Sequence, residues 1–421
     1  MLATLSALHA ETVALPDALG RVVSGDIISR EDVVPFARSA MDGFAVRAAD
    51  TMGASPEHRI ELGIAGSSYA EAGRAELSSR AAIAISTGAP MPAGADAVIP
   101  IERVEHSGHS IRISASTSPG DCVFPPAEDV QRGDRLIARG EVVGAATVSL
   151  LAFAGHAQIY VYKRPRVSVL ATGNELVDIS ATPQHGQIRN SNAPGLMALA
   201  AESGALARFV GVARDEPAAL RALLESACAD TDLIVTTGGA SRGERDYVKA
   251  ALIELGAEMH FREVAMRPGR PVGFATWRGV PVCVLPGNPA AAFVCFQLFV
   301  RPALFLLAGR MNVRRPRLRA RLRDRIHGRP GMEYVVFASA ALCDEGLEVA
   351  PLPNQCSALV RTAAEANAFI YVPEESAELR PGATVDVEIL DWSSVAGRGA
   401  NERAATGVRS EKPQIHRPAP Q

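Results

Sequence analysis

Between residues 166 and 309 the chain repeats one pattern: a short apolar or β-branched run, a turn, and then a helical stretch. Strands are predicted over 167–171, 208–212, 233–237 and 280–285. Helices are predicted over 193–203, 216–229 and 247–255, and the first and last of these stop at Gly204 and Gly256. This alternation predicts a doubly wound, mostly parallel sheet with helices on both faces. Ligands of such sheets bind beyond the carboxyl ends of the strands.

The flanking regions have a different pattern. Residues 43–164 contain many short apolar runs separated by Gly and Pro, and residues 311–390 are again rich in strand formers. A length of 421 residues suggests roughly three domains. The predicted class is therefore α/β plus β, a multidomain chain with a β-rich insertion and a C-terminal β domain. From Ala396 onward the chain has almost no large apolar residues, which predicts a disordered tail.

The composition excludes several classes of protein. Hydrophobic residues make up 48% and charged residues 21%, as in folded soluble chains. The 43 basic and 46 acidic residues leave a net charge of −3, so no global positive field draws the chain to nucleic acid, and any anion must be captured locally. Six cysteines without a CxxC pair argue against a zinc ribbon or a disulfide scaffold, and a reducing cytoplasm is expected.

No targeting segment is predicted. The N-terminus lacks both a basic leader and a sustained apolar run, so we expect no signal peptide. The most apolar stretch, residues 290–308, is interrupted by Gln297, Arg301 and Pro302. A buried core helix that ends near Val300 is the favoured interpretation, and no membrane span is required.

Two strand ends feed glycine-containing turns into helix starts. In residues 233–248, Gly238 and Gly239 permit close backbone approach, Ser241 can donate to an anion, and Asp246 can cap the following helix. The alternative is a tight turn with a capping aspartate. The segment fits neither a P-loop nor GxGxxG.

The second such turn, in residues 284–293, contains Pro286 and Gly287 and places Asn288 as a helix N-cap and Pro289 at the first helical position. Helix capping alone explains Asn288 and Pro289. It does not explain a second glycine-containing strand end in the same predicted sheet, and a ligand-binding role remains open.

Charged residues follow other predicted strands. Glu175 comes after a strand end and could bind Mg²⁺ or a hydroxyl group, or be solvated. Arg267 and Arg270 flank a Pro-Gly turn, an arrangement suited to a phosphate or another tetrahedral oxyanion, although a solvated loop is the alternative. Asp215 is most simply a helix N-cap.

Turn chemistry or solvation explains Asp42, Thr87 and Asp129 when each is taken alone. Five arginines alternate with other residues over 317–325, so on a strand they would share one face. A solvated face, or one paired with acidic neighbours, is favoured there over a polyanion site.

Taken together and in order, the motifs resemble the molybdopterin molybdenumtransferase family, which includes the C-terminal domain of gephyrin. The motifs that carry the resemblance are SAMDGFAV, TGAPMPAGADAVI, an AED-containing loop, TGNELV, TTGGASRGERDYV, MRPGRP, LPGNP and QCSALVRTAAEANAFIYVPE. They span about residues 1–392. Several long motifs in a fixed order are far more specific than any one of them.

The resemblance implies an elongated subunit that forms a homodimer. Its parts would be a discontinuous N-terminal domain (1–45 and 131–165), a β-rich insertion (46–130), an α/β molybdopterin-binding domain (166–310), a C-terminal β domain (311–392) and the tail (393–421).

The resemblance also implies the reaction, which is Mg²⁺-dependent insertion of molybdate into the dithiolene of adenylylated molybdopterin with release of AMP. The residues expected to be catalytic are Asp42, Glu175, Asp215, Asp246, Arg267 and Arg270. Glu175, Asp215 and Asp246 would hold the metal. Substrate would be bound by Thr87, Asp129, Gly238, Gly239, Ser241, Pro286, Gly287, Asn288, Pro289 and Ser357. Arg267 and Arg270 stand where the family usually has lysine, and a guanidinium should bind oxyanions rather than give up a proton.

Two other functions stay open at this point. One is the preceding adenylyl transfer to molybdopterin, and the other is a non-catalytic molybdopterin-binding or scaffolding role. The expected partners are adenylylated molybdopterin and molybdate, with transient contact to a molybdopterin adenylyltransferase and to molybdoenzyme chaperones. Neither nucleic acid nor a membrane is expected as a partner.

Overall fold

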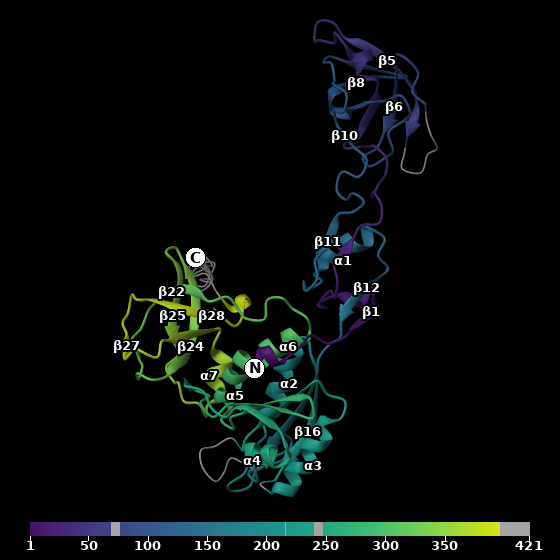
Figure 1. Cartoon of the computed structure of the whole chain (residues 1–421). Helices are drawn as coiled ribbons and strands as arrows, with labels where there is room; N and C mark the ends of the chain where they lie inside the picture. Colours follow the sequence, from purple (N-terminus) through teal and green to yellow (C-terminus); the bar gives the residue numbers. More distant parts are fainter. Residues whose placement is uncertain (69–75, 215, 240–246, 396–421) are drawn as a thin grey trace, which may run out of the picture. The chain divides into compact units, whose positions relative to one another are not determined.

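The computed structural model describes residues 1–68, 76–214, 216–239 and 247–395 (Figure 1). The chain divides into two compact units. The first contains residues 1–11, 20–24 and 161 onward, and the second contains 12–19 and 25–160. Strands β1 (Ala10–Ala14) and β12 (Gln158–Tyr162) carry the chain from one unit into the other. The predicted tail from Ala396 lies outside the described residues.

A six-stranded mixed sheet forms the centre of the first unit. Its order is β16-β13-β17-β21-β20-β18. The first four strands in this order run parallel, and β20 runs antiparallel to both of its neighbours, β21 and β18, so the sheet is mixed. The strands are β13 (Arg166–Thr172), β16 (Leu206–Ala213), β17 (Leu233–Thr237), β18 (Glu258–Phe261), β20 (Gly273–Trp277) and β21 (Val280–Leu285).

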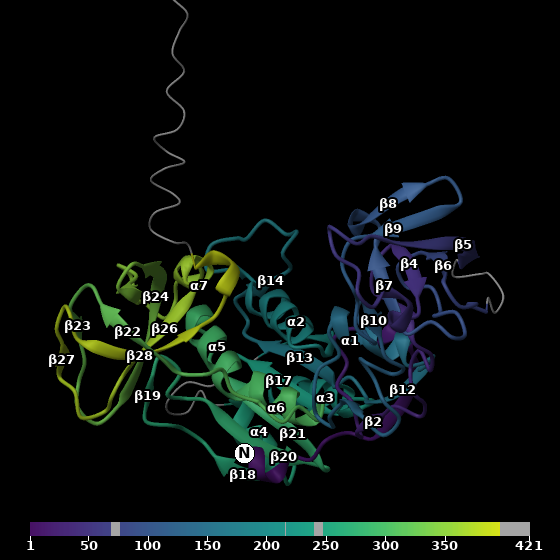
Figure 2. The ribbon, with the colours of Figure 1, turned by 90° about the horizontal axis from the view of Figure 1, so that it is seen from above.

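Helices cover both faces of this sheet, because alternate side chains of its buried strands point to opposite sides. Leu233 and Val235 belong to the core beneath α2 (Asn192–Glu202) and α5 (Pro289–Cys295). Ile234 lies between them in sequence and belongs to the core beneath α3 (Pro217–Cys228) and α4 (Tyr247–Glu254). Figure 1 shows the two sets of helices on either side of the strands, and Figure 2 shows the same elements from above. The predicted helices agree with α2, α3 and α4 to within one or two residues.

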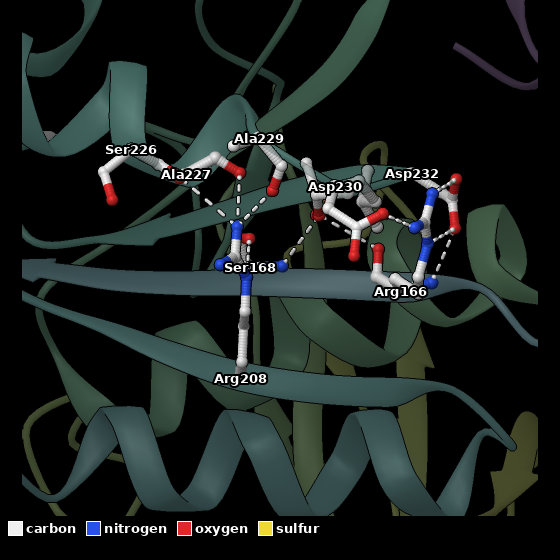
Figure 3. Close-up of polar contacts among 10 residues, drawn as sticks. Arg166, Ser168, Arg208, Ser226, Ala227, Ala229, Asp230 and Asp232 are labelled. Carbon is white, nitrogen blue, oxygen red and sulfur yellow. Dashed lines mark hydrogen bonds and ion pairs between the residues drawn. The ribbon is translucent and has the colours of Figure 1, made fainter.

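Arg208 on β16 closes the end of α3, as Figure 3 shows. Its Nη2 donates to the carbonyl oxygens of Ser226 (3.2 Å), Ala227 (3.3 Å) and Ala229, and its Nε donates to Ser168 Oγ (3.0 Å). The last carbonyls of a helix have no partner within the helix, and a cation there also faces the negative end of the helix dipole. Arg208 therefore fixes α3 against the sheet.

We expect Arg208→Met to lower the free energy of unfolding by about 1–2 kcal/mol, because carbonyls at the end of α3 lose a charged donor. Urea denaturation followed by circular dichroism measures the loss. The matched control is Arg221→Met on α3, which forms a longer ion pair with Glu254 Oε2 at 3.9 Å. Equal losses in the two variants would contradict the capping role.

The apolar segment 290–308 lies within one continuous helical run from Pro289 to Leu307, and the prediction that it ends near Val300 is wrong. A π-helical segment (Phe296–Val300) joins α5 to α6 (Arg301–Leu307). Pro302 cannot donate to the carbonyl four residues back, and the wider π turn before it accommodates that loss. By length and composition the run could cross a membrane, but most of it is buried within the protein, as in the core helix of a soluble chain.

A closed barrel follows in the first unit. The order β24-β25-β22-β28-β26 returns to β24, and β19 (Met266–Arg267) pairs in parallel with the first two residues of β24, Glu333 and Tyr334. The barrel strands are β22 (Leu318–Leu322), β24 (Glu333–Cys343), β25 (Gly346–Pro351), β26 (Ala368–Val372) and β28 (Thr384–Ile389). Beside them lie β23 (Ile326–His327), β27 (Glu378–Leu379) and α7 (Val360–Glu365).

The arginine-rich stretch is β22 and the residues around it, and its side chains pair with acids as favoured from the sequence. Ion pairs join Arg317 to Glu333 (3.5 Å), Arg319 to Asp386 (2.8 Å), Arg321 to Glu345, and Arg325 to Glu378 (2.9 Å). Ala320 and Leu322 point into the barrel core. This face is therefore neutralised by the barrel's own carboxylates.

The second unit contains another six-stranded mixed sheet, in the order β7-β4-β6-β5-β9-β8, as the short apolar runs predicted. Its strands are β4 (Gly43–Val46), β5 (Ile60–Ser68), β6 (Ala81–Ile85), β7 (Ala97–Pro100), β8 (Val104–Ser107) and β9 (Ser110–Ile113). The smaller elements of this unit are α1 (Ala145–Phe153) and the pairs β2 (Ile27–Ile28) with β11 (Arg135–Ile137) and β3 (Arg38–Ser39) with β10 (Val123–Phe124). The finer domain boundaries stay a prediction.

The second unit should lose stability in mild acid through His156, which follows α1. The side chain is 9% exposed and its Nε2 has no hydrogen-bond partner in the described part of the chain. Burial, together with the nearby Arg30, lowers the pKa of His156 below its usual value. As the pH falls through about 6.5, His156 is therefore protonated in the unfolded chain before it is protonated in the folded protein. This difference lowers the free energy of unfolding.

We expect the stability of wild type to fall between about pH 6.5 and the lower folded-state pKa, and His156→Gln to remove part of that fall. Urea denaturation across this pH range measures the difference. Parallel pH profiles for the two proteins would contradict the assignment.

Candidate active site

The carboxyl ends of three parallel strands meet at one cleft of about 560 Å³. The register pairs Ala171 with Thr237, and Thr237 with Leu285, so β13, β17 and β21 end at the same level. The cleft is lined by the turns that follow these strands and by the start of α2, including Glu175, Gly238, Gly239, Gly287, Asn288 and Pro289. The structure thus brings the three predicted loops together.

Gly238 and Gly239 let the turn after β17 lie directly against the end of β13. Gly238 has φ +91°, and a Cβ there would lie 2.3 Å from the carbonyl oxygen of Thr172. Gly239 has φ +62°, and a Cβ there would lie 2.8 Å from Val248 Cγ2. Both positions need glycine for conformation and for space. The predicted close backbone approach is therefore present, although its neighbour is Thr172 and not a ligand.

Asn192 holds the turns after β17 and β21 together, and the sequence analysis missed it. Its Nδ2 donates to Thr237 Oγ1 and to the carbonyl oxygen of Gly287, both at 2.8 Å. Thr237 Oγ1 in turn donates to the carbonyl oxygen of Pro286 at 3.0 Å. The only sequence signal was a polar residue just before a predicted helix, which usually indicates a cap.

Glu175 is exposed at the mouth of this cleft. Gly173 before it has φ +146°, and the carboxylate oxygens of Glu175 occupy the space that a Cβ of Gly173 would need (2.6 and 2.7 Å). The turn therefore folds the glutamate back over the end of β13. A hard cation could reach this carboxylate from the cleft.

Ser357 joins the barrel region to the start of α5. Asn288 Nδ2 donates to Ser357 Oγ (3.1 Å), and the backbone N–H of Ala290 donates to the carbonyl oxygen of Ser357 (3.1 Å). Asn288 and Ser357 thus line a second, larger cleft of about 1380 Å³ between the sheet and the barrel, together with Arg267 and Arg270. The two clefts share Pro271, Pro286 and Asn288.

The two predicted oxyanion-binding arginines differ in their surroundings. Arg270 donates to Glu263 through Nε (3.2 Å) and Nη2 (3.1 Å), so its guanidinium is already paired with a carboxylate. Arg267 is exposed, lies over the ring of Tyr334 (5.9 Å from its centroid) and makes no ion pair in the described part of the chain. Of the two arginines, Arg270 is thus the one with a described carboxylate partner, and the prediction that both bind an oxyanion stays a prediction. Glu263 lies seven residues before Arg270 in an irregular segment, so its pairing had no sequence signal.

The remaining predicted residues fall in two groups. Asp42, Thr87 and Asp129 belong to the second unit, where Asp42 Oδ1 accepts from the backbone N–H (2.7 Å) and Oγ1 (3.1 Å) of Thr87, and Asp129 is exposed. Asp215, Ser241 and Asp246 lie outside the described residues. Within residues 1–68, 76–214, 216–239 and 247–395, no three His, Cys, Asp or Glu side chains form a metal-binding group.

Comparison with known proteins covers nearly the whole chain. Residues 1–155 match the MoeA N-terminal region (domain I and II), residues 168–305 a probable molybdopterin binding domain, and residues 319–390 the MoeA C-terminal region (domain IV). The molybdopterin molybdenumtransferase of Staphylococcus aureus strain Mu50 is 33% identical over 394 residues, which are 93% of each chain. The chain belongs to the molybdopterin molybdenumtransferase family.

Other members of the molybdopterin molybdenumtransferase family support this assignment. Molybdopterin molybdenumtransferase 2 of Mycobacterium tuberculosis is 35% identical over 384 residues, 89% of this chain and 94% of the relative. A crystal structure of the molybdopterin biosynthesis MoeA protein from Pyrococcus horikosii has a TM-score of 0.79 at 32% identity, and the match covers 93% of this chain and 97% of that one. The family, the multidomain fold and the enzymatic nature predicted from the motifs are confirmed.

Proposed function

We propose that this enzyme inserts molybdate into the dithiolene of adenylylated molybdopterin, with Mg²⁺ required and AMP released. The observation that carries the proposal is the shared cleft, where the turns after β13, β17 and β21 meet. These three turns come from segments that the chain order keeps far apart. Their convergence provides one cleft for a phosphate-bearing substrate at the edge where open α/β sheets bind ligands.

The proposal gives each part of the site a task. The glycines of the turns after β17 and β21 let these turns pack against β13 and against each other, and this packing shapes the cleft that would receive the pterin or phosphate. Asn192 keeps these two turns in register through its contacts with Thr237 and Gly287. In the neighbouring cleft Arg267 would attract molybdate, which is a tetrahedral dianion. A guanidinium suits such an oxyanion, and Arg267 makes no ion pair with a described residue.

The described part of the metal site fits Mg²⁺. Glu175 offers one exposed carboxylate beside the cleft, and Mg²⁺ commonly takes one or two carboxylates together with substrate phosphates and water. We propose Asp215 and Asp246 as the further ligands. Bound Mg²⁺ would offset phosphate charge at the site.

The test is cofactor formation from purified protein, adenylylated molybdopterin, Mg²⁺ and low molybdate. We expect a molybdenum-containing product and AMP, and neither product when Mg²⁺ is removed with a chelator. A parallel reaction with molybdopterin and ATP tests the adenylyl transfer reaction. Turnover only in that second reaction, or in neither, would overturn the proposal.

We further propose a cytoplasmic homodimer that contacts a molybdopterin adenylyltransferase and molybdoenzyme chaperones transiently. The basis is membership of the molybdopterin molybdenumtransferase family. Sedimentation velocity tests the dimer, and a monomer at micromolar concentration would contradict it.

A further inference from the structure

A buried ammonium group lies beneath the turn that carries Arg267. Lys249 on α4 is 5% exposed, and its Nζ donates to the carbonyl oxygen of Pro271 at 2.8 Å. Lysine is rarely buried this deeply, because removing the charge from water is costly unless the ammonium is hydrogen-bonded. The contact with Pro271 helps to satisfy the buried ammonium and joins α4 to this turn.

Pro271 stands where this contact affects the site. It ends the turn that begins at Arg267, and it is one of the residues that line both clefts. Two further hydrogen bonds hold the turn, from Val272 N–H to the carbonyl oxygen of Gly269 and from Val264 N–H to the carbonyl oxygen of Arg270, each at 3.0 Å. Both are local to this segment. The Lys249 contact joins the segment to α4, the helix that follows the turn after β17.

We infer that Lys249 is a positioning residue that fixes the Arg267 turn relative to the cleft at the strand ends. The role in the reaction rests on the proposed function, whereas the anchoring itself does not. A turn held at Pro271 keeps Arg267 at a constant place beside the shared wall of the two clefts. Without the ammonium, Arg267 would sample several positions, and oxyanion binding would weaken more than the chemical step.

A substitution at Gly273 offers a second way to remove the contact between Lys249 and Pro271. A Cβ at this position would lie 2.8 Å from Lys249 Cε and 3.4 Å from the carbonyl oxygen of Phe261. The nearer neighbour is a flexible side chain, so Gly273→Ala should displace Lys249 and leave β20 in place. The glycine therefore provides the space that the lysine stem occupies.

The experiment compares wild type, Lys249→Met, Gly273→Ala and the double variant, with Glu254→Gln as the control on the exposed side of α4. Hydrogen exchange measures the Val272 and Val264 amides. Steady-state kinetics measure the KM for molybdate and kcat. In both single variants we expect exchange at these amides to quicken about tenfold or more, since a charged hydrogen bond is lost. Amides of β17 should not change.

The KM for molybdate should rise about tenfold, with kcat at saturating molybdate within about twofold of wild type. The double variant should resemble either single one, because both remove the same contact. Unchanged exchange at the turn would overturn the anchoring, and a fall in kcat at constant KM would overturn the positioning role. The exchange result does not depend on turnover. An inactive wild type that shows the exchange contrast would therefore count against the proposed function and not against the anchoring.

Discussion

Gly238→Ala should lose most of its activity and about 3 kcal/mol of stability. The backbone at Gly238 has φ +91°, which penalises any residue with a Cβ. The added methyl group would also lie 2.3 Å from the carbonyl oxygen of Thr172, a backbone atom at the end of β13 that cannot move by a rotamer change. The turn must therefore shift away from the strand, and the cleft loses its shape. Thermal unfolding and the cofactor-formation assay measure the two losses.

Gly279→Ala is the matched control for this substitution. Gly279 lies in the turn between β20 and β21, has φ +78°, and has open space where a Cβ would stand. It therefore isolates the cost of the backbone conformation, which is about 1 kcal/mol. Activity of Gly279→Ala should match that of wild type. If Gly238→Ala behaved like this control, the close packing of the turn against Thr172 would not be what shapes the cleft.

Arg267→Met should raise the KM for molybdate about a hundredfold, because a charged contact with the oxyanion is lost. Arg270→Met should have a smaller effect, since the Arg270 guanidinium already donates to Glu263 and contributes less free charge. The measurement is initial rate against molybdate concentration at saturating adenylylated molybdopterin.

Arg267→Lys serves as the conservative control, since it keeps the positive charge on a different head group. It should recover a large part of the lost affinity. A larger rise in the KM for molybdate in Arg270→Met than in Arg267→Met would contradict the assignment of Arg267 as the cation that binds molybdate.

The sequence could predict the elements whose signals are local. The strands β17 and β21 follow from unbroken apolar runs, and α2 and α4 from glycines just past their ends. The run from Pro289 to Leu307 shows the limit of such signals. Pro302 indicates a break, but burial on nearly all sides keeps the helix continuous through a π turn.

The site could be predicted where it lies in turns and missed where it depends on contacts between distant segments. Glu175, Gly238 and Asn288 follow predicted strands, so the rule for open sheets brings them to one edge. The contacts of Asn192 and Lys249 link segments whose separation in space no local pattern encodes. The pairing of Glu263 with Arg270 is short-range, but it lies in an irregular segment that has no periodic pattern. A buried lysine in particular looks in sequence like an exposed residue of an amphipathic helix.

The central claim is that the turns after β13, β17 and β21 form the molybdopterin site. Hydrogen exchange of the full chain with and without molybdopterin tests it most directly. We expect slower exchange at residues 173–177, 238–239 and 287–290, with little change in the barrel strands β22 and β28. Protection confined to other segments, with these three turns exchanging as fast as before, would contradict it.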